Sequence, residues 1–286
     1  MALQAWEQVR PMRNGGSQPH LMKCSDGNHY VVKFKNNPQG RRTLVNEMIA
    51  TRLGEILHVP MASGAVVSVD RAHIDAYRLG MEAGRGRIPF EPGRCYGSRF
   101  IGNPKSSCYG PTAPPLANPE VFWGALVLDM WLCNADQRQA VFHRAAYGPY
   151  DATMIDHGCC FTGCEWRFDD RRPGCGNLYR PYSVYERIHG IDSFTPWLTV
   201  LEEVIDMARI SAAAEGIPEE WYDNDATALK ELLRTIHVRR HNVRGELLRL
   251  RCFMPHVFVN WEHASSFALA PKGQALDSLN NEQGAA

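Results

Sequence analysis

The sequence contains no long apolar segment and no excess of charge of either sign. No stretch approaches the roughly 18 apolar residues that a membrane-spanning helix needs, so we expect no membrane partner. Lysine plus arginine and aspartate plus glutamate balance at 31 each, and a neutral chain has no global field that attracts nucleic acid. The first ten residues lack the apolar core of a signal peptide. These absences together predict a protein of the reducing cytoplasm.

Paired cysteine motifs are also absent, although the chain has nine cysteines. A chain of 286 residues is long enough to build a core without a disulfide framework. Four cysteines follow His157, but their spacing matches no CxxC pair of a zinc site. Free thiols are the favoured interpretation, and structural zinc is the alternative. The four are Cys159, Cys160, Cys164 and Cys175.

Two aspartates stand out in the middle of the chain. The apolar run over residues 123–133 predicts a buried helix. Residues 140–143 and 152–155 predict two short strands joined by a turn. Asp136 lies in the polar run before the first strand, and Asp156 directly follows the second.

Two aspartates at the ends of adjacent strands are an arrangement that the active site of a phosphotransferase can use. One such residue can act as a base beside a hydroxyl acceptor, and the other can bind magnesium. An aspartate before a turn is more often a cap or a turn former. The paired pattern alone leaves both interpretations open.

The N-terminal third supplies further parts of such a site. Strands are predicted over residues 5–12, 21–24 and 29–35, with a glycine-containing loop between the first two. Glycines between strands let backbone N–H groups approach a phosphate closely, although an ordinary tight turn is the alternative. Lys33 lies in the third strand, and Glu47 lies on a helix predicted over 41–57. A strand lysine paired with a helix glutamate is the arrangement that holds a lysine toward phosphates.

The rest of the chain alternates between irregular and helical signals. Residues 65–69 predict a further strand, and the Gly- and Pro-rich residues 84–119 predict a crossing with little regular structure. Helices are predicted over 196–214 and 226–250. Periodicity is lost after about residue 254.

Four segments together resemble the HipA-like kinase domain family. They are RNGGSQPHLMKCSDGNHYVVKFKNNPQGRRTLVNEMIATRLGE, NADQRQAVF, MIDHGCCF and IPEEWY with LLRTIHVRRHNV, and they occur in the family's order over roughly residues 1–250. The resemblance implies an α+β, bilobal protein-kinase-like fold with a β-rich N-lobe and a mainly helical C-lobe. We assign residues 1–100 to an ATP-covering lobe with a crossing to about 118, residues 119–254 to the helical lobe, and 255–286 to an irregular tail.

The resemblance also implies residue roles, with ATP and Mg²⁺ as cofactors. Asp136 would be the catalytic base, and Asp156 would bind magnesium. Lys33 would hold phosphates and Glu47 would orient it. The phosphate-covering loop would consist of Gly15, Gly16, Ser17 and Gln18.

The chain departs from the family pattern at three places. His157 stands where protein kinases have phenylalanine, and His20 stands where a phosphate-loop lysine is expected. Ala140 or Val141 occupies the position of an asparagine that would bind magnesium. Gln139, one residue earlier, is the candidate replacement.

These features predict a kinase that transfers a phosphoryl group from ATP to a hydroxyl of a protein (Ser/Thr) or of a small molecule. The alternative is a nucleotide-binding pseudokinase that regulates a partner protein, and the missing asparagine is the feature that favours it. A DNA-bound toxin module gains no support from the neutral charge. The sequence names neither the acceptor nor the oligomeric state.

Overall fold

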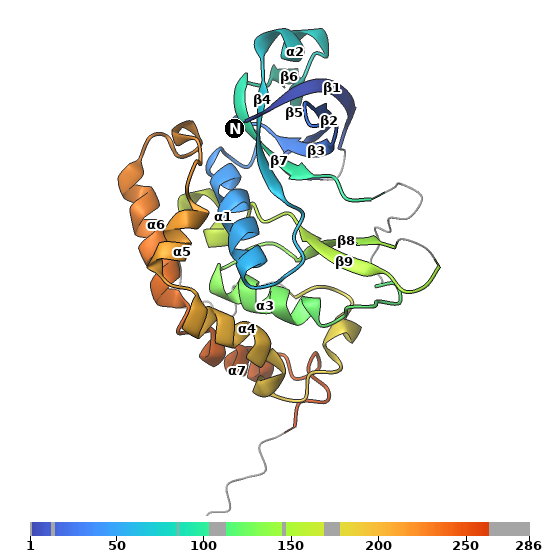
Figure 1. The fold of residues 1–286 in the computed structure, drawn as a ribbon, viewed down its shortest axis with the longest axis vertical. Coiled ribbons are helices and arrows are strands. Elements are labelled where there is room, and N and C mark those ends of the chain that lie inside the picture. The colour runs from blue at the N-terminus through green and yellow to red at the C-terminus, as the bar shows by residue number, and fades with distance from the viewer. Residues whose placement is uncertain are drawn as a thin grey trace, which may run out of the picture.

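A five-stranded barrel is built from the N-terminal third of the chain (Figure 1). The computed structural model describes residues 2–12, 15–84, 86–102, 113–144, 147–168 and 178–262. The strands follow the order β1-β2-β3-β7-β4, and a parallel pairing of β1 with β4 closes the barrel. They are β1 (Leu3–Pro11), β2 (His20–Cys24), β3 (His29–Lys33), β4 (Gly64–Val69) and β7 (Gly93–Arg99).

Local chemistry sets the first hairpin of the barrel. Between β2 and β3, the Asp26 carboxylate accepts a hydrogen bond from the backbone N–H of Asn28 at 3.1 Å, and Gly27 adopts a φ of 80°. An aspartate and a glycine at these positions favour a tight turn. The inward residues of the strands then form the barrel's own apolar core, which includes Met22 and Val32.

The expectation of little regular structure over residues 84–119 is wrong for its first part. This part contains β6 (Gly86–Pro89) and β7, which is paired on both sides inside the barrel. Gly97 explains the discrepancy, because a Cβ there would lie 2.7 Å from Cγ2 of Val67. Glycine in a strand often marks such a close approach. Residues 103–112 lie outside the described part of the chain.

Helix α1 (Arg42–Ile56) lies at the junction between the barrel and the remaining helices (Figure 1). It is buried on nearly every face, as a helix that packs on several elements must be. Four of its buried residues are polar: Thr43, Asn46, Glu47 and Thr51. Since buried polar groups are generally hydrogen-bonded, this helix is the place to look for an organised site.

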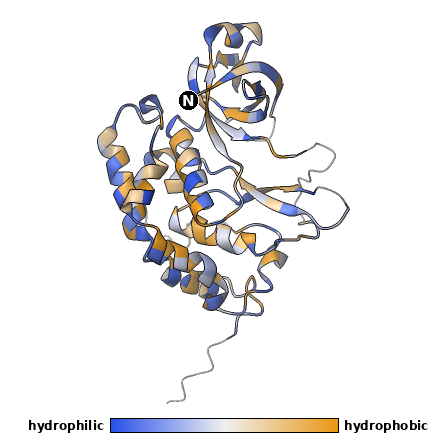
Figure 2. Cartoon of the chain, in the orientation of Figure 1, coloured by the Kyte–Doolittle hydropathy of each residue, from blue (hydrophilic) through white to orange (hydrophobic). Residues whose placement is uncertain are grey.

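The second half of the chain is mainly helical and shares one large apolar core with α1. Its central helix α3 (Val121–Trp131) is predominantly apolar, whereas α6 (Ala226–Arg239) and α7 (Val243–Phe253) alternate apolar and polar residues (Figure 2). The strands β8 (Gln139–His143) and β9 (Asp151–Ile155) form the predicted hairpin. The remaining helices are α2 (Arg71–Ala76), α4 (Thr195–Thr199) and α5 (Met207–Ala213).

Both long C-terminal helices that periodicity predicts are interrupted. The first changes into a π-turn at Val200–Val204 and ends at Ile205, after which Asp206 caps α5 by accepting from the backbone N–H of Arg209 at 2.8 Å. An aspartate that caps a new helix start is a local competitor of continuous helix. The second is broken between α6 and α7.

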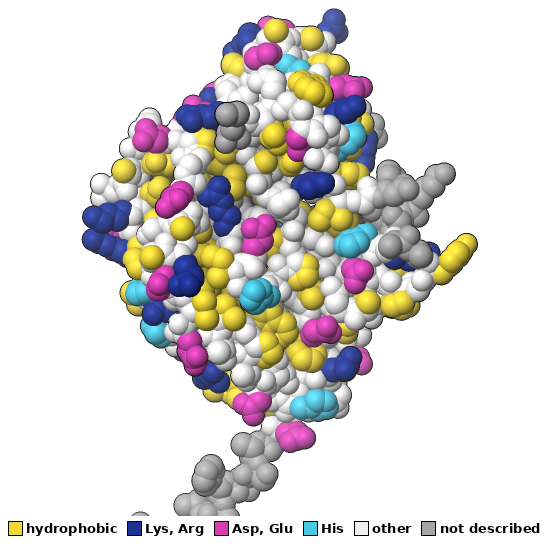
Figure 3. All heavy atoms as spheres, viewed as in Figure 1, with side chains coloured by type: hydrophobic (Ala, Val, Ile, Leu, Met, Phe, Trp, Pro, Cys, Tyr) yellow, Lys and Arg dark blue, Asp and Glu magenta, His cyan; other side chains and the backbone are white. Residues whose placement is uncertain are grey.

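Short elements complete the chain. Strand β5 (Gly80–Ala83) pairs with β6 outside the barrel. The single-turn helices are η1 (Cys160–Glu165), η2 (Tyr182–Tyr185), η3 (Ile191–Phe194) and η5 (Glu219–Tyr222). Of the helices in the described ranges, none has the length and apolar character to cross a bilayer. Acidic and basic side chains are interspersed on the face in Figure 3.

Candidate functional site

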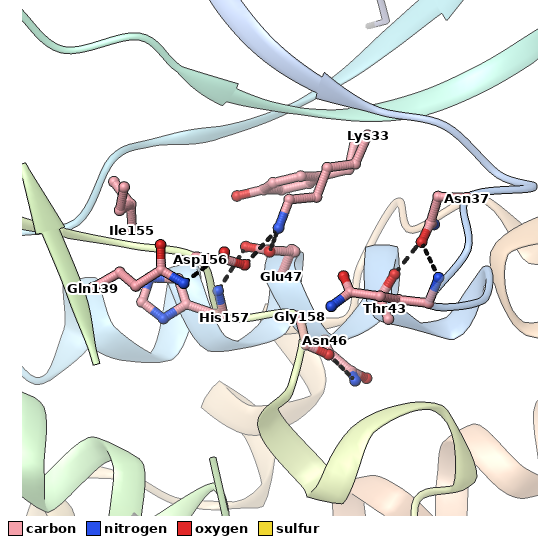
Figure 4. Close-up of polar contacts among 12 residues, drawn as sticks. Lys33, Asn37, Thr43, Asn46, Glu47, Gln139, Ile155, Asp156, His157 and Gly158 are labelled. Carbon is pink, nitrogen blue, oxygen red and sulfur yellow. Dashed lines mark hydrogen bonds and ion pairs between the residues drawn. The ribbon is translucent and has the colours of Figure 1, made fainter. Parts of the chain in front are cut away.

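The centre of the candidate site is a buried lysine between two carboxylates. Lys33 at the end of β3 forms an ion pair with Oε1 of Glu47 on α1, and its Nζ lies 2.6 Å from Oδ1 of Asp156 after β9 (Figure 4). The Lys33 and Glu47 side chains are 6% and 1% exposed, whereas Asp156 is 29% exposed. The ion pair expected between Lys33 and Glu47 is therefore present, and Asp156 joins it.

One ammonium cannot neutralise two carboxylates. Burial alone would raise the pKa of Asp156, but the Lys33 ammonium holds it at about 2. Burial works against the charge of Lys33 too, yet its two carboxylate partners raise its pKa. Lys33 and Asp156 are thus ionised at neutral pH, while burial raises the pKa of Glu47 against the opposing effect of the Lys33 ammonium. Such a group of charges attracts a further cation at its exposed member, Asp156.

The backbone after Asp156 is folded tightly onto Glu47. Asp156 adopts a left-handed φ of 61°, a conformation that aspartate tolerates better than most residues. The N–H of His157 donates to Oε2 of Glu47 at 3.0 Å. A Cβ at Gly158 would lie 3.2 Å from Oε1 of Glu47 and 3.8 Å from Nζ of Lys33. The glycine therefore allows the chain to pass beside the ion pair.

Asn46, the neighbour of Glu47 on α1, holds the same segment. Its Nδ2 donates to the carbonyl oxygens of Gly158, Cys160 and Gly163 at 2.8, 2.9 and 3.1 Å. Its Oδ1 accepts from Nε1 of Trp166 at 2.8 Å. Sequence reasoning missed Asn46, and the available signal was an asparagine among apolar residues of a helix.

Gln139 lies on the exposed side of Asp156. It begins β8 and pairs with Ile155 across the hairpin, which places its side chain beside the next residue. Its Nε2 donates to Oδ2 of Asp156 at 3.0 Å (Figure 4). Ala140 and Val141 are buried in the hairpin and offer no side-chain oxygen. The structure thus brings the side chain of Gln139 into contact with Asp156.

Asp136 is half-buried in the turn before β8. Its backbone N–H donates to Oδ1 of Asn134 at 3.2 Å, and its Oδ1 accepts from the N–H of Gln137 at 2.7 Å. The N–H of Ala135 donates to the carbonyl of Cys159 at 2.9 Å. Burial raises the pKa of the Cys159 thiol to about 11, and the charges of Asp136 and Asp156 contribute in the same direction. Both aspartates are thus close enough to act on one thiol.

The glycine loop contacts segments outside the barrel strands. Gln18 has a left-handed φ of 48°, and its side-chain amide bonds the backbone N–H and C=O of Glu82 in β5 at 2.7 and 3.1 Å. A Cβ at Gly16 would lie 2.8 Å from the side chain of Gln39. Ser17 is buried, while Gly15 and Gly16 are exposed. Of the predicted site residues, Lys33, Glu47, Asp156 and Gln139 are in direct contact, and Gly15, Gly16, Ser17 and Gln18 form a separate group.

The side-chain oxygens at Asp156 suit one kind of metal site and not another. Across the part of the chain that the structure describes, no three His, Cys, Asp or Glu side chains are grouped to hold one. A closed structural site needs about four protein ligands, whereas magnesium is commonly held by one or two carboxylates together with substrate phosphates. The oxygens of Asp156 and Gln139 fit the second kind of site. Cys175, part of the zinc alternative, lies outside the described residues.

Comparison with known families decides the relationship of the N-terminal half. Residues 6–145 match the model of a family described as HipA-like kinase. These residues belong to that family. The HipA-like region contains the barrel except for the first residues of β1, together with α1, Asp136 and Gln139, and it ends before Asp156. The resemblance expected from the sequence is confirmed over these residues. No curated protein matches the chain.

Solved structures share the fold at low sequence identity. The structure of the Golgi casein kinase with Mn/ADP bound has a TM-score of 0.50 and 11% identity, and the alignment covers 91% of this chain and 74% of that one. The Helicobacter pylori proinflammatory kinase CtkA has a TM-score of 0.49 and 11% identity, with 85% of this chain and 99% of that one covered. The first likeness shows a protein-kinase-like fold with both strands and helices, as predicted.

Proposed function

We propose that the chain is an ATP-dependent kinase that transfers a phosphoryl group to a hydroxyl of a protein (Ser/Thr) or of a small molecule. The observation that carries this proposal is the buried Lys33 held between Glu47 and the partly exposed Asp156. The HipA-like kinase match over residues 6–145 supports the same chemistry. The Golgi casein kinase, which shares the fold, was solved with Mn/ADP bound, which supports a nucleotide and a divalent metal as cofactors.

Lys33 is the residue that we assign to the phosphates. It lies on a rigid strand, and Glu47 holds its ammonium from the buried side. Asp156 occupies the other side of the ammonium, at 2.6 Å. Lys33 can exchange this second partner for a phosphate oxygen while Glu47 keeps it in place, because the two carboxylates bind different sides of one group. Glu47 is therefore an orienting residue in this proposal.

Asp156 and Gln139 are the residues that we assign to Mg²⁺. The ion would neutralise phosphate charge during transfer. The amide of Gln139 already contacts Asp156 through its nitrogen, and rotation of the amide about its last bond presents the oxygen instead. Gln139 would in this way replace the asparagine that Ala140 and Val141 lack.

The remaining roles complete the proposed kinase. Asp136 would accept or orient the proton of the acceptor hydroxyl. The exposed backbone of Gly15 and Gly16 would cover the phosphates, while Gln18 holds the loop to β5. We assign the barrel, within residues 1–100, and the helical residues 119–254 to two lobes. A cytoplasmic location is part of the proposal.

The second candidate is a pseudokinase that binds nucleotide and regulates a partner protein. One observation favours it: Ala140 and Val141 are both apolar and buried in the hairpin. Near-octahedral coordination by oxygen is demanding, and a longer glutamine in a shifted register is a less rigid ligand than an asparagine. Binding without turnover is the signature of this alternative.

Comparison of the wild-type protein with Asp136→Ala separates the candidates. We expect the substitution to leave ATP affinity unchanged in calorimetry and to abolish magnesium-dependent turnover, because a general base contributes ~10²–10⁴ in rate and little to ground-state binding. A pseudokinase would bind ATP without turnover in both proteins. If Asp136 only forms the turn, the melting temperature will fall while the folded fraction keeps its turnover. Wild-type protein that binds no nucleotide contradicts both candidates.

A further inference from the structure

A buried arginine connects the segments that carry the two aspartates of the candidate site. Arg138 lies between Asp136 and Gln139 in sequence and is only 3% exposed. Its Nε and Nη2 bind the two carboxylate oxygens of Asp129 on α3, with Nε at 2.9 Å. This bidentate pairing fixes the plane of the guanidinium group. The remaining nitrogen, Nη1, is therefore aimed in one direction.

That direction leads to both neighbours of Asp156 in the chain. Nη1 of Arg138 donates to the carbonyl oxygen of Ile155 at 3.0 Å and lies 3.0 Å from Nδ1 of His157. Since a guanidinium only donates, Nδ1 of His157 is the acceptor and the ring is neutral. Arg138 thus holds the residue before Asp156 by its backbone and the residue after it by its side chain.

The same network continues to Asp136. Asn134 donates from Nδ2 to Oδ1 of Asp129 at 3.0 Å. Its own Oδ1 accepts from the backbone N–H of Asp136 at 3.2 Å. Asp129, Asn134 and Arg138 are all nearly fully buried. Hydrogen bonds therefore link the backbone around both aspartates of the candidate site to one carboxylate, that of Asp129 on the central helix α3.

We propose that Arg138 is a positioning residue, which fixes the direction of the Asp156 carboxylate for a divalent metal. Asp156 has a left-handed backbone, and Lys33 and Gln139 contact its side chain directly. With both neighbouring residues clamped, the carboxylate leaves the backbone at a fixed angle. The inference rests on the proposed function, because it assumes that Asp156 binds the metal.

The competing explanation is that Arg138 only pairs with the buried carboxylate of Asp129 and so stabilises the fold. Substitution of Arg239 is the matched control, because it removes another buried arginine that pairs with a carboxylate. Arg239 is 5% exposed, donates to the carbonyl oxygens of Met130 and Trp131 at 3.3 Å each, and pairs with Glu246 at 3.2 Å. Arg239 is thus a buried, paired arginine that also reaches α3, but Met130, Trp131 and Glu246 lie outside the candidate site.

The experiment measures binding of Mn²⁺ with ADP to the wild type, Arg138→Met, Arg138→Lys and Arg239→Met. Titrations of Mn²⁺ followed by electron paramagnetic resonance give the metal affinity, and calorimetry without metal gives the affinity for ADP alone.

We expect Arg138→Met to weaken Mn²⁺ binding by ~10–100-fold, the usual effect of removing a group that orients a metal ligand. Affinity for ADP alone should change less than about twofold, since in the described part of the chain Arg138 bonds Asp129, Ile155 and His157 and none of the predicted nucleotide-binding residues. Arg239→Met should lower the melting temperature without changing Mn²⁺ affinity.

Arg138→Lys keeps the charge beside Asp129 and loses the fixed fork of donors. If Arg138→Met does not fold, Arg138→Lys still allows the measurement. We expect Arg138→Lys to weaken Mn²⁺ binding as well. Wild-type Mn²⁺ affinity in a folded Arg138 variant overturns the positioning role and leaves the proposed function intact. A wild-type protein that binds no Mn²⁺ with ADP overturns both. Equal losses of Mn²⁺ affinity in the Arg138 and Arg239 variants also overturn the positioning role.

Discussion

At the scale of single residues, the arrangement of one cation between two anions sets the behaviour of the site. Glu47 is buried and has Lys33 as its charged partner, whereas Asp156 is partly exposed and also contacts Gln139. Loss of Lys33 would leave Glu47 as an unpaired buried charge, and the two carboxylates would then repel each other. The three residues therefore behave as one unit, and substitutions in them are not additive.

The substitution Lys33→Met tests this unit directly. Removing one partner of a buried ion pair typically costs about 3–5 kcal/mol, so we expect a large loss of unfolding free energy in denaturant titrations. The double substitution Lys33→Met with Glu47→Met should recover part of that loss, because it removes the unpaired charge as well. Additive effects of the single substitutions Lys33→Met and Glu47→Met would contradict the coupling.

The lowered pKa of His20 makes the free energy of unfolding depend on pH. Its ring is buried against Phe34 and Phe90, and burial together with the nearby Arg87 lowers its pKa to about 4. The unfolded state, with a pKa near 6.5, takes up a proton as the pH falls below that value, and the folded state does not. Stability is therefore full above about pH 6.5 and falls toward pH 4.

Between pH 7 and pH 5, His20 should account for a loss of ~2 kcal/mol in unfolding free energy. His157 acts in the same direction, because burial and Arg138 lower its pKa. The substitution His20→Gln should reduce the difference between unfolding titrations at the two pH values. The same pH dependence in the wild type and in His20→Gln would show that His20 is not the titrating group.

At the scale of elements, α1 carries more of the site than Glu47 alone. Asn46 binds three carbonyl groups of the segment after Asp156, while Glu47 binds Lys33 and the N–H of His157. The helix and this segment are thus joined independently of any bound ligand. The Lys33–Glu47 pair should then be assembled before nucleotide binds.

The substitution Asn46→Ala should loosen that segment. Loss of the amide leaves buried carbonyl groups without their donor, at a cost of about 1–3 kcal/mol. We expect faster amide hydrogen exchange over residues 157–163. The substitution Thr51→Val is the control, because Thr51 is buried on the same helix and contacts Tyr96 instead, at 3.2 Å. Exchange in that segment should stay at the wild-type rate in the control, and an equal increase in both variants would contradict the role of Asn46.

Sequence patterns located most elements but not their contacts. The strands before Lys33, the helix of Glu47 and the hairpin before Asp156 follow local periodicity, and each appears close to its predicted position. Strand β7 escaped notice because its glycines, needed for close packing, resemble loop residues. Asn46 and Arg138 escaped notice because their partners are distant in sequence, and a polar residue on a buried element was the only local signal.

At the scale of the whole molecule, the large core joins α1 to the C-terminal helices, so that binding at the site should stabilise the entire fold. With Mg²⁺ and ADP at about 100 times the dissociation constant, the expected gain is about 2.7 kcal/mol. A gain of this size should raise the melting temperature by several degrees. The substitution Asp156→Asn should remove the part of this increase that depends on Mg²⁺ and leave the part due to ADP alone. An unchanged Mg²⁺-dependent increase in the variant would reject Asp156 as a metal ligand.

The two bonds of Lys33 also differ in when they can form. Glu47 follows Lys33 by 14 residues, and Asp156 follows it by 123. A ribosome that adds about 5–20 residues per second therefore produces the first partner of Lys33 within roughly 1–3 s and the second after roughly 6–25 s. During that interval Glu47 is the one carboxylate partner of Lys33 that has been synthesised. The chain thus acquires the partly exposed carboxylate of its candidate site late in its own synthesis.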